Sequence, residues 1–112
     1  GGERTTPNYS VMGVAKAALE ASVRYLSVDL GKNNIRVNSL SSGPMKTLAG
    51  SAITGARYIF KYSEKSSPMS KNPSLKEVSK SAVYLLSDLS SGVTGENHFV
   101  DGGYNIVAIP KE

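Results

Sequence analysis

Two strand-like runs, each preceded by a helical pattern, constrain the fold of this chain more than any other feature of its sequence. The first run extends from Ile35 to Leu40 and breaks over residues 42–44, and the second covers Asn97 to Val100. Helices that alternate with strands are typical of a parallel sheet. Because parallel strands are buried on both faces and need neighbours, two of them do not form an independent sheet. The pattern therefore predicts one half of an α/β domain.

The first helical pattern is the longest in the chain. Thr6 is a candidate N-cap, Pro7 suits the first helical position, and Gly31 follows the last apolar residue. We expect a helix over residues 7–30. Its centre is rich in small side chains, which allow another helix or a sheet to approach closely: Ala15, Ala17, Ala18, Ala21 and Ser22.

A second long helix is predicted from residue 74. Ser74 and Glu77 have the spacing of a capping box. An apolar stripe follows at helical intervals, made of Leu75, Val78, Ala82, Leu85, Leu86 and Leu89. Between the two long helices, residues 47–53 fit either a short helix or a loop, residues 55–64 are expected to be helical, and residues 66–73 to form a loop.

Length, charge and cysteine content narrow the class of protein. The 112 residues have room for one domain. The net charge of +4 results from 13 Lys and Arg against 9 Asp and Glu, and the basic residues are scattered, which favours solvated charge over a nucleic-acid site. The absence of cysteine excludes disulfides and thiolate chemistry. No apolar run reaches the roughly 18 residues of a membrane span, and no signal-peptide pattern is present. We expect a soluble intracellular protein.

The stretch PNYSVMGVAK places Tyr9 and Lys16 in the first predicted helix, with Gly13 between them. Seven residues complete nearly two turns, so the two side chains are expected on the same side, about 10.5 Å apart along the helix axis. A nearby ammonium favours the phenolate form of a tyrosine, and an ammonium also donates hydrogen bonds to sugar hydroxyl groups. The pair fits one elongated ligand, although such spacing more often reflects a core tyrosine and a solvated lysine.

Three segments together resemble a known family. In this order, NYSVMGVAKAALEASVRYLSVDLG, NIRVNSLSSGPMKTLAG and YLLSDLSSGVTGENHFVDGGYNIV resemble the C-terminal half of the NADH-dependent enoyl-[acyl-carrier-protein] reductases of the short-chain dehydrogenase/reductase superfamily. That superfamily most often spaces its tyrosine and lysine four residues apart, a position held here by Met12, whereas the wider gap from Tyr9 to Lys16 marks the enoyl reductases. The resemblance covers essentially all of residues 1–112. It implies an α/β fold that is the C-terminal half of a Rossmann-like, doubly wound parallel sheet.

The resemblance implies a reaction and a cofactor. Tyr9 would hydrogen-bond or protonate the enolate oxygen formed when hydride from NADH reaches the enoyl thioester, and Lys16 would hold the nicotinamide ribose. Further cofactor contacts would come from the SGPMKT segment, at Gly43, Pro44, Met45 and Thr47. A segment that follows the carboxyl end of a strand is also where an open α/β sheet binds its ligand. Taken alone, the glycine and proline of this segment fit a plain strand-ending turn.

The resemblance also implies a substrate lid over about residues 45–64. The residues that would line the substrate are Tyr9, Met12, Ala49, Ile53, Ile59 and Phe60. Lys46 and Arg57 are candidates to meet an acidic carrier protein, although each taken singly fits solvated surface. His98 has no metal-ligand partner in the sequence and is expected to be structural, so no metal is predicted. Asp101 belongs to a segment that resembles the family's closing turn.

The predicted function is reduction of trans-2-enoyl-acyl-carrier protein by NADH in fatty acid elongation, as part of a longer enzyme. The opening GGERTTPN lacks a methionine, which suits processing or a cut within a larger protein. The family's Gly-rich phosphate-binding turn lies outside these residues, so we expect the isolated chain to be inactive. The family implies a homotetramer, in the cytoplasm or the plastid stroma. A carbonyl-reducing member of the superfamily and a non-catalytic interaction module stay open as alternatives.

Overall fold

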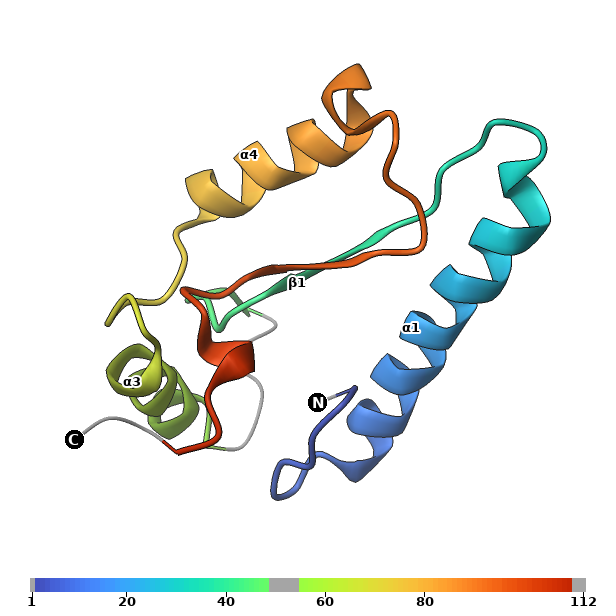
Figure 1. The fold of residues 1–112 in the computed structure, drawn as a ribbon. Coiled ribbons are helices and arrows are strands. Elements are labelled where there is room, and N and C mark those ends of the chain that lie inside the picture. Colours follow the sequence, from blue (N-terminus) through green and yellow to red (C-terminus); the bar gives the residue numbers. More distant parts are fainter. Residues whose placement is uncertain (1, 49–54, 110–112) are drawn as a thin grey trace. The chain divides into compact units, whose positions relative to one another are not determined.

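The computed structural model describes residues 2–48 and 55–109. In chain order, the elements are α1 (Ser10–Gly31), β1 (Ser39–Ser42), α3 (Ala56–Ser66), α4 (Leu75–Leu86), a 3-10 turn η1 (Asp88–Ser90), β2 (Asn97–Val100) and a second 3-10 turn η2 (Tyr104–Ile106) (Figure 1).

The described chain divides into two compact units. The first unit comprises Gly1–Ser39 with Ser87–His98, and the second Leu40–Leu86 with Phe99–Glu112. Among the described residues, Val23 is the one buried hydrophobic side chain, at 6% exposure. The physical reason is that two strands with their helices do not provide enough layers to enclose a common core.

The two strands pair in parallel, which confirms the predicted α/β class. The Ser39 N–H donates to the Glu96 carbonyl at 2.9 Å, and the Gly43 N–H donates to the Val100 carbonyl at 2.9 Å. The donor that comes later in the first strand segment pairs with the acceptor that comes later in the second, so the two strands run in the same direction. The two strands run side by side in Figure 1 and form one two-stranded sheet.

The second strand has the predicted bounds, but the first begins later than predicted, at Ser39 and not at Ile35. Before β1, side chains add to one backbone hydrogen bond, which the Gly95 N–H donates to the Val37 carbonyl at 2.8 Å. The Val37 N–H donates to Thr94 Oγ1 at 3.0 Å, and Asn38 Nδ2 donates to the Val93 carbonyl at 3.0 Å. Polar side chains thus position the segment before β1. An apolar alternation pattern does not indicate such contacts.

The helix α1 also begins later than predicted. The helix starts at Ser10, and Tyr9 is its N-cap, so the expected start at Pro7 with Thr6 as the cap is wrong. The reason is Asn8, whose φ of 59° lies in the left-handed region and interrupts a right-handed helix. The first helical hydrogen bond then runs from the Gly13 N–H to the Tyr9 carbonyl at 2.6 Å.

Polar contacts tie the first unit together. On α1, the buried Ser27 Oγ lies 2.6 Å from the Val23 carbonyl oxygen and 3.0 Å from the Val37 carbonyl oxygen. The Arg36 guanidinium donates to Ser90 Oγ at 2.9 Å and to the carbonyls of Val93 and Ser87 at 3.2 and 3.3 Å. Hydrogen bonds therefore provide most of the contacts that join α1, the segment before β1 and the η1 region.

In the second unit, the loop between α3 and α4 is pinned to the end of β2. Ser67 is fully buried; its hydroxyl donates to the Lys71 carbonyl at 3.0 Å and accepts from the Lys71 N–H at 3.1 Å. The Met69 N–H donates to the Gly102 carbonyl at 3.1 Å. This loop, predicted over residues 66–73, is therefore ordered by its own polar groups and by the turn after β2.

The predicted capping box at the start of α4 is confirmed. The Ser74 N–H donates to Glu77 Oε1, and the Glu77 N–H donates to Ser74 Oγ, both at 3.1 Å. Lys71 Nζ lies 2.9 Å from Glu77 Oε2. The hydrogen bond from Lys71, followed by those from Ser74, lowers the pKa of Glu77 from 4.5 to about 2.

We predict that Lys71→Met raises the pKa of Glu77 toward its usual range, because the largest cause of the shift is removed. Ser74→Ala should raise this pKa as well. Since the pKa of the folded form is depressed, the stabilisation is complete above about pH 4.5 and is lost as the pH falls toward 2. Carboxyl-detected NMR titration of Glu77 measures the effect, and Lys32→Met, which removes an exposed lysine at the C-cap of α1, is the control. An unchanged Glu77 titration in both variants contradicts the assignment.

Candidate functional site

The first part of the candidate site lies at the start of α1. Tyr9 is half-buried at the N-cap, with φ −128° and ψ 12°. Lys16 and Met12 are exposed on the helix itself. Because Tyr9 precedes the first helical residue, the helical period fixes the direction of Lys16 but not that of the tyrosine. The prediction that both lie inside one helix is therefore corrected for Tyr9.

The second part follows the carboxyl end of β1. Gly43 is buried, Pro44 and Met45 are half-buried, and Thr47 is exposed. The Thr47 N–H donates to the Met45 carbonyl at 3.0 Å, which closes a three-residue turn. This turn occupies the position where open α/β sheets bind ligands, as the sequence predicted.

The buried Gly43 has a packing reason to be glycine. A Cβ at this position would lie 2.9 Å from Pro73 Cδ and 3.3 Å from Asp101 Cα. The backbone therefore passes closer to its neighbours than a side chain allows. This contact supports the plain structural interpretation of Gly43, whatever else the segment binds.

The helix α3 carries two of the predicted substrate residues. Ile59 and Phe60 are half-buried, and the Phe60 carbonyl accepts a hydrogen bond from Asn72 Nδ2 at 2.8 Å. Lys46 Nζ lies 5.1 Å from the centroid of the Phe60 ring. The structure thus brings the predicted cofactor segment and a predicted substrate residue into contact, a pairing the sequence did not indicate. The predicted residues Ala49 and Ile53 lie outside the described residues.

An aromatic cluster on α3 was also missed from the sequence. The rings of Tyr58 and Tyr62 stack with centroids 6.0 Å apart, and Tyr62 meets Tyr104 edge to face at 6.4 Å. The spacing of Tyr58 and Tyr62 by one helical turn is the signal that would have found the stacked pair. Arg57, a predicted contact for a carrier protein, is exposed beside it.

The candidate residues are divided between the two units. Tyr9, Met12 and Lys16 belong to the first unit, whereas the Gly43–Thr47 segment and α3 belong to the second. The contact between Lys46 and Phe60 lies wholly inside the second unit.

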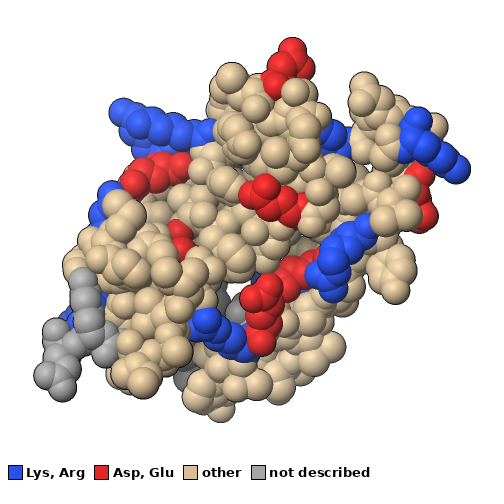
Figure 2. All heavy atoms as spheres, in the orientation of Figure 1, with Lys and Arg blue, Asp and Glu red and all other residues tan. Residues whose placement is uncertain are grey.

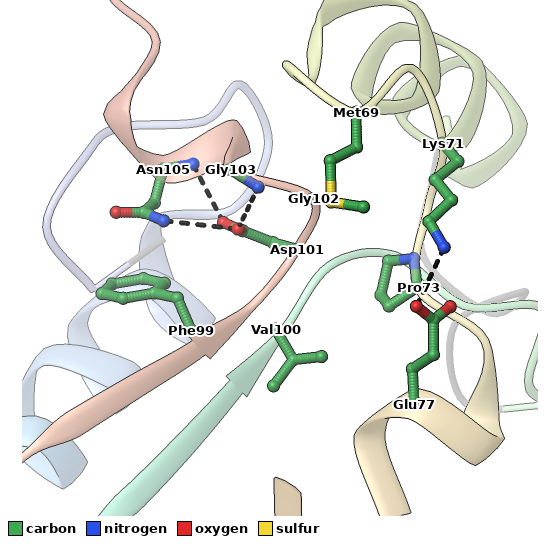
Figure 3. Close-up of a pocket in the computed structure, with 10 residues that line it drawn as sticks. All are labelled: Met69, Lys71, Pro73, Glu77, Phe99, Val100, Asp101, Gly102, Gly103 and Asn105. Carbon is green, nitrogen blue, oxygen red and sulfur yellow. Dashed lines mark hydrogen bonds and ion pairs between the residues drawn. The ribbon is translucent and has the colours of Figure 1, made fainter. Parts of the chain in front are cut away.

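A pocket of about 310 Å³ in the second unit was not predicted (Figure 3). Its lining residues are Met69, Lys71, Pro73, Glu77, Phe99, Val100, Asp101, Gly102, Gly103 and Asn105. Its charged groups have partners within the pocket wall: Lys71 pairs with Glu77, and Asp101 accepts from the N–H groups of Gly103 and Asn105 at 3.0 and 2.9 Å. The carboxylate of Asp101 therefore shapes the turn after β2.

Among the described residues, the remaining charged and titratable groups do not form a second cluster with the composition of a metal site. His98 Nδ1 lies 2.7 Å from Glu96 Oε1. Within residues 2–48 and 55–109, no three His, Cys, Asp or Glu side chains gather as a metal site requires. Basic and acidic side chains lie interleaved on the face shown in Figure 2. In the part of the chain that the structure describes, no helix combines the length and apolar character that a membrane crossing requires.

Comparison with known proteins decides the family. Residues 1–105 match the family model described as "Enoyl-(Acyl carrier protein) reductase". The chain belongs to this family. The resemblance inferred from its three sequence segments is thereby confirmed.

Individual relatives agree with the family model. The chain is 62% identical over 109 residues to enoyl-[acyl-carrier-protein] reductase [NADH] 1 of Rhizobium meliloti, covering 97% of the chain and 40% of that protein. It is 54% identical to the Staphylococcus aureus FabI, which is named for NADPH, covering 96% of the chain and 42% of that protein. The chain thus spans about two fifths of the length of the curated relatives it matches.

Solved structures agree as well. The crystal structure of FabI from Candidatus Liberibacter asiaticus superposes with a TM-score of 0.93 at 53% identity, covering 99% of the chain and 43% of that structure. The enoyl reductase of Anaplasma phagocytophilum, solved in complex with NAD, gives a TM-score of 0.91 at 52% identity, covering 98% of the chain and 42% of that structure. The α/β fold is therefore that of the reductase family.

We predict that Gly43→Ala destabilises the protein by about 1–3 kcal/mol, because the added methyl group overpacks against Pro73 and the Asp101 backbone. The matched control is Gly31→Ala at the end of α1, where an added Cβ meets nothing within 4 Å. Urea unfolding of the two variants against the parent measures the difference. Equal midpoints for both variants contradict the packing argument.

Proposed function

We propose that this chain, within a longer polypeptide, forms the substrate side and part of the cofactor site of an NADH-dependent enoyl-[acyl-carrier-protein] reductase. Hydride passes from NADH to the β-carbon of a trans-2-enoyl thioester, and a proton is added at the α-carbon, so NADH becomes NAD⁺ and the thioester becomes saturated. The observation that carries the proposal is the spacing of Tyr9 and Lys16 in a chain that belongs to this family.

Tyr9 has the role of stabilising the enolate oxygen that forms as hydride arrives. A phenolic O–H is a hydrogen-bond donor, and a donor aimed at developing negative charge lowers the barrier more than one aimed at the ground state. The half-buried N-cap position of Tyr9 supports this role, because partial burial limits competition from water.

The cofactor is NADH, and the donors on this chain fit such a dinucleotide. Lys16 presents an exposed ammonium suited to ribose hydroxyl groups, and Thr47 presents an exposed hydroxyl suited to a phosphate oxygen. Gly43, Pro44 and Met45 complete the proposed cofactor segment, whose turn is closed by the Thr47 N–H. The nicotinamide supplies the hydride. The choice of NADH follows the names of the Rhizobium meliloti and Rickettsia relatives.

The acyl chain is proposed to contact Met12 on α1 and Ile59 and Phe60 on α3, with Ala49 and Ile53 as further wall residues in a lid over about residues 45–64. Apolar side chains that keep partial exposure, such as Met12 at 48%, are suited to cover an acyl chain. The substrate is carried by acyl-carrier protein, to which Arg57 offers an exposed positive charge.

Assembly and location complete the proposal. The small residues of α1 allow close packing of a symmetry-related helix, and Ala15, Ala18 and Ser22 are exposed. They support a homotetramer of the complete enzyme, for which we propose a location in the cytoplasm. The plastid stroma stays a prediction for a plastid-bearing source.

We predict that Lys16→Ala weakens NADH binding about tenfold or more, because charge-assisted hydrogen bonds to the ribose are lost. The test protein joins residues 1–112 to the N-terminal part of the Rhizobium meliloti reductase, and NADH fluorescence measures the affinity. Lys32→Ala, which removes an exposed lysine at the C-cap of α1, is the matched control. Unchanged NADH affinity in the Lys16 variant contradicts the assigned role.

We predict that Tyr9→Phe lowers turnover of crotonyl coenzyme A by about 10²- to 10³-fold, the usual effect of removing one donor to an oxyanion. NADH affinity should change little, because the tyrosine acts on the substrate. Steady-state absorbance at the NADH band measures turnover. A parent fusion that oxidises no NADH with crotonyl coenzyme A overturns the proposed function itself, whereas normal turnover by the variant returns Tyr9 to a structural role.

A further inference from the structure

We propose that Lys46 is a positioning residue that couples cofactor binding to substrate binding through its contact with Phe60. The inference rests on the proposed function, since it links the cofactor segment to the substrate helix of that same site. The inference goes beyond the proposed function because it gives Lys46, which has no assigned role in the reaction, an energetic effect on the binding of both ligands.

The backbone around Lys46 fixes where its side chain starts. The Thr47 N–H donates to the Met45 carbonyl at 3.0 Å, so Lys46 is the central residue of a tight three-residue turn. Its two neighbours are the residues proposed to meet the cofactor. Any change in the backbone of this turn when the dinucleotide binds is therefore passed directly to the origin of the Lys46 side chain.

The other end of the contact is also fixed. Phe60 is half-buried on α3, and its carbonyl accepts from Asn72 Nδ2 at 2.8 Å, which ties this part of the helix to the loop before α4. The Lys46 ammonium lies 5.1 Å from the Phe60 ring centroid. This separation is within the roughly 6 Å over which a cation is attracted to the face of an aromatic ring.

The contact therefore joins two anchored elements. The contact favours arrangements in which α3, with Ile59 and Phe60, keeps its position relative to the turn, because the cation then stays over the ring. A dinucleotide that holds the turn in place also holds the substrate wall in place. Such linkage is reciprocal, so the acyl thioester must strengthen NADH binding by the same factor as NADH strengthens thioester binding.

A lysine at this position has two simpler roles. It is solvated surface, or it meets an acidic carrier protein. A small thioester that lacks the carrier protein removes the second role from the measurement. Lys61→Met, which deletes another exposed lysine next to Phe60 on α3, tests the solvated-surface role: if Lys46 were only solvated surface, the two variants would have the same effect. Direct attraction between Lys46 and the pyrophosphate acts on NADH with and without thioester alike, so it cancels in the coupling factor.

The experiment uses the fusion that joins residues 1–112 to the N-terminal part of the Rhizobium meliloti reductase. NADH affinity is measured by fluorescence, first without thioester and then with enough butyryl coenzyme A to fill the substrate site. The acyl chain of butyryl coenzyme A has no double bond, so it accepts no hydride. The ratio of the two affinities is the coupling factor. Lys46→Met should reduce this factor by about two- to fivefold, which corresponds to one exposed cation–π contact.

The aromatic partner gives an independent arm. Phe60→Leu should reduce the coupling factor as Lys46→Met does, and the double variant should be no worse than either single variant. Lys46→Arg and Phe60→Tyr should keep the factor, because each preserves a cation or an aromatic face. Lys61→Met should leave it at the parent value.

Three results overturn the inference: a coupling factor of one in the parent, a parent-like factor in Lys46→Met, or additive losses in the double variant. Each of them is compatible with normal NADH oxidation on crotonyl coenzyme A, so the inference fails separately from the proposed function. A parent fusion with no turnover overturns both.

Discussion

The parallel pairing of β1 with β2 is the constraint on which the rest of the structure depends. It places the carboxyl ends of both strands at one edge, so that the segment after Gly43 and the turn after Val100 emerge together. Asp101 then packs against Gly43, and the same turn receives the Met69 N–H of the loop before α4. The candidate cofactor segment is therefore built on an edge already fixed by backbone hydrogen bonds.

Sequence reasoning succeeded where the signal is local. The capping box of Ser74 and Glu77 spans three residues, and its two hydrogen bonds need nothing from the rest of the fold. The bounds of β2 followed from a short strand-like run closed by Asp101 and two glycines. The family followed from the order of three motifs, each of which is only weakly specific when taken alone.

Sequence reasoning failed where conformation depends on one backbone angle or on distant partners. The left-handed conformation of Asn8 moves the start of α1. Asparagine tolerates this conformation, but the apolar pattern of the sequence does not indicate that it occurs here. The late start of β1 depends on Thr94 and Val93, far along the chain. The contact between Lys46 and Phe60 joins residues that no helical or strand period relates.

The place of Tyr9 at the N-cap has a consequence for how such enzymes diverge. A residue inside a helix cannot move without shifting every helical neighbour, but a cap residue belongs to the turn in front of it. Changes at Pro7 or Asn8 therefore reorient the phenol while the register of Lys16 on α1 stays the same. Selection can therefore adjust the proposed proton donor and the proposed ribose contact separately.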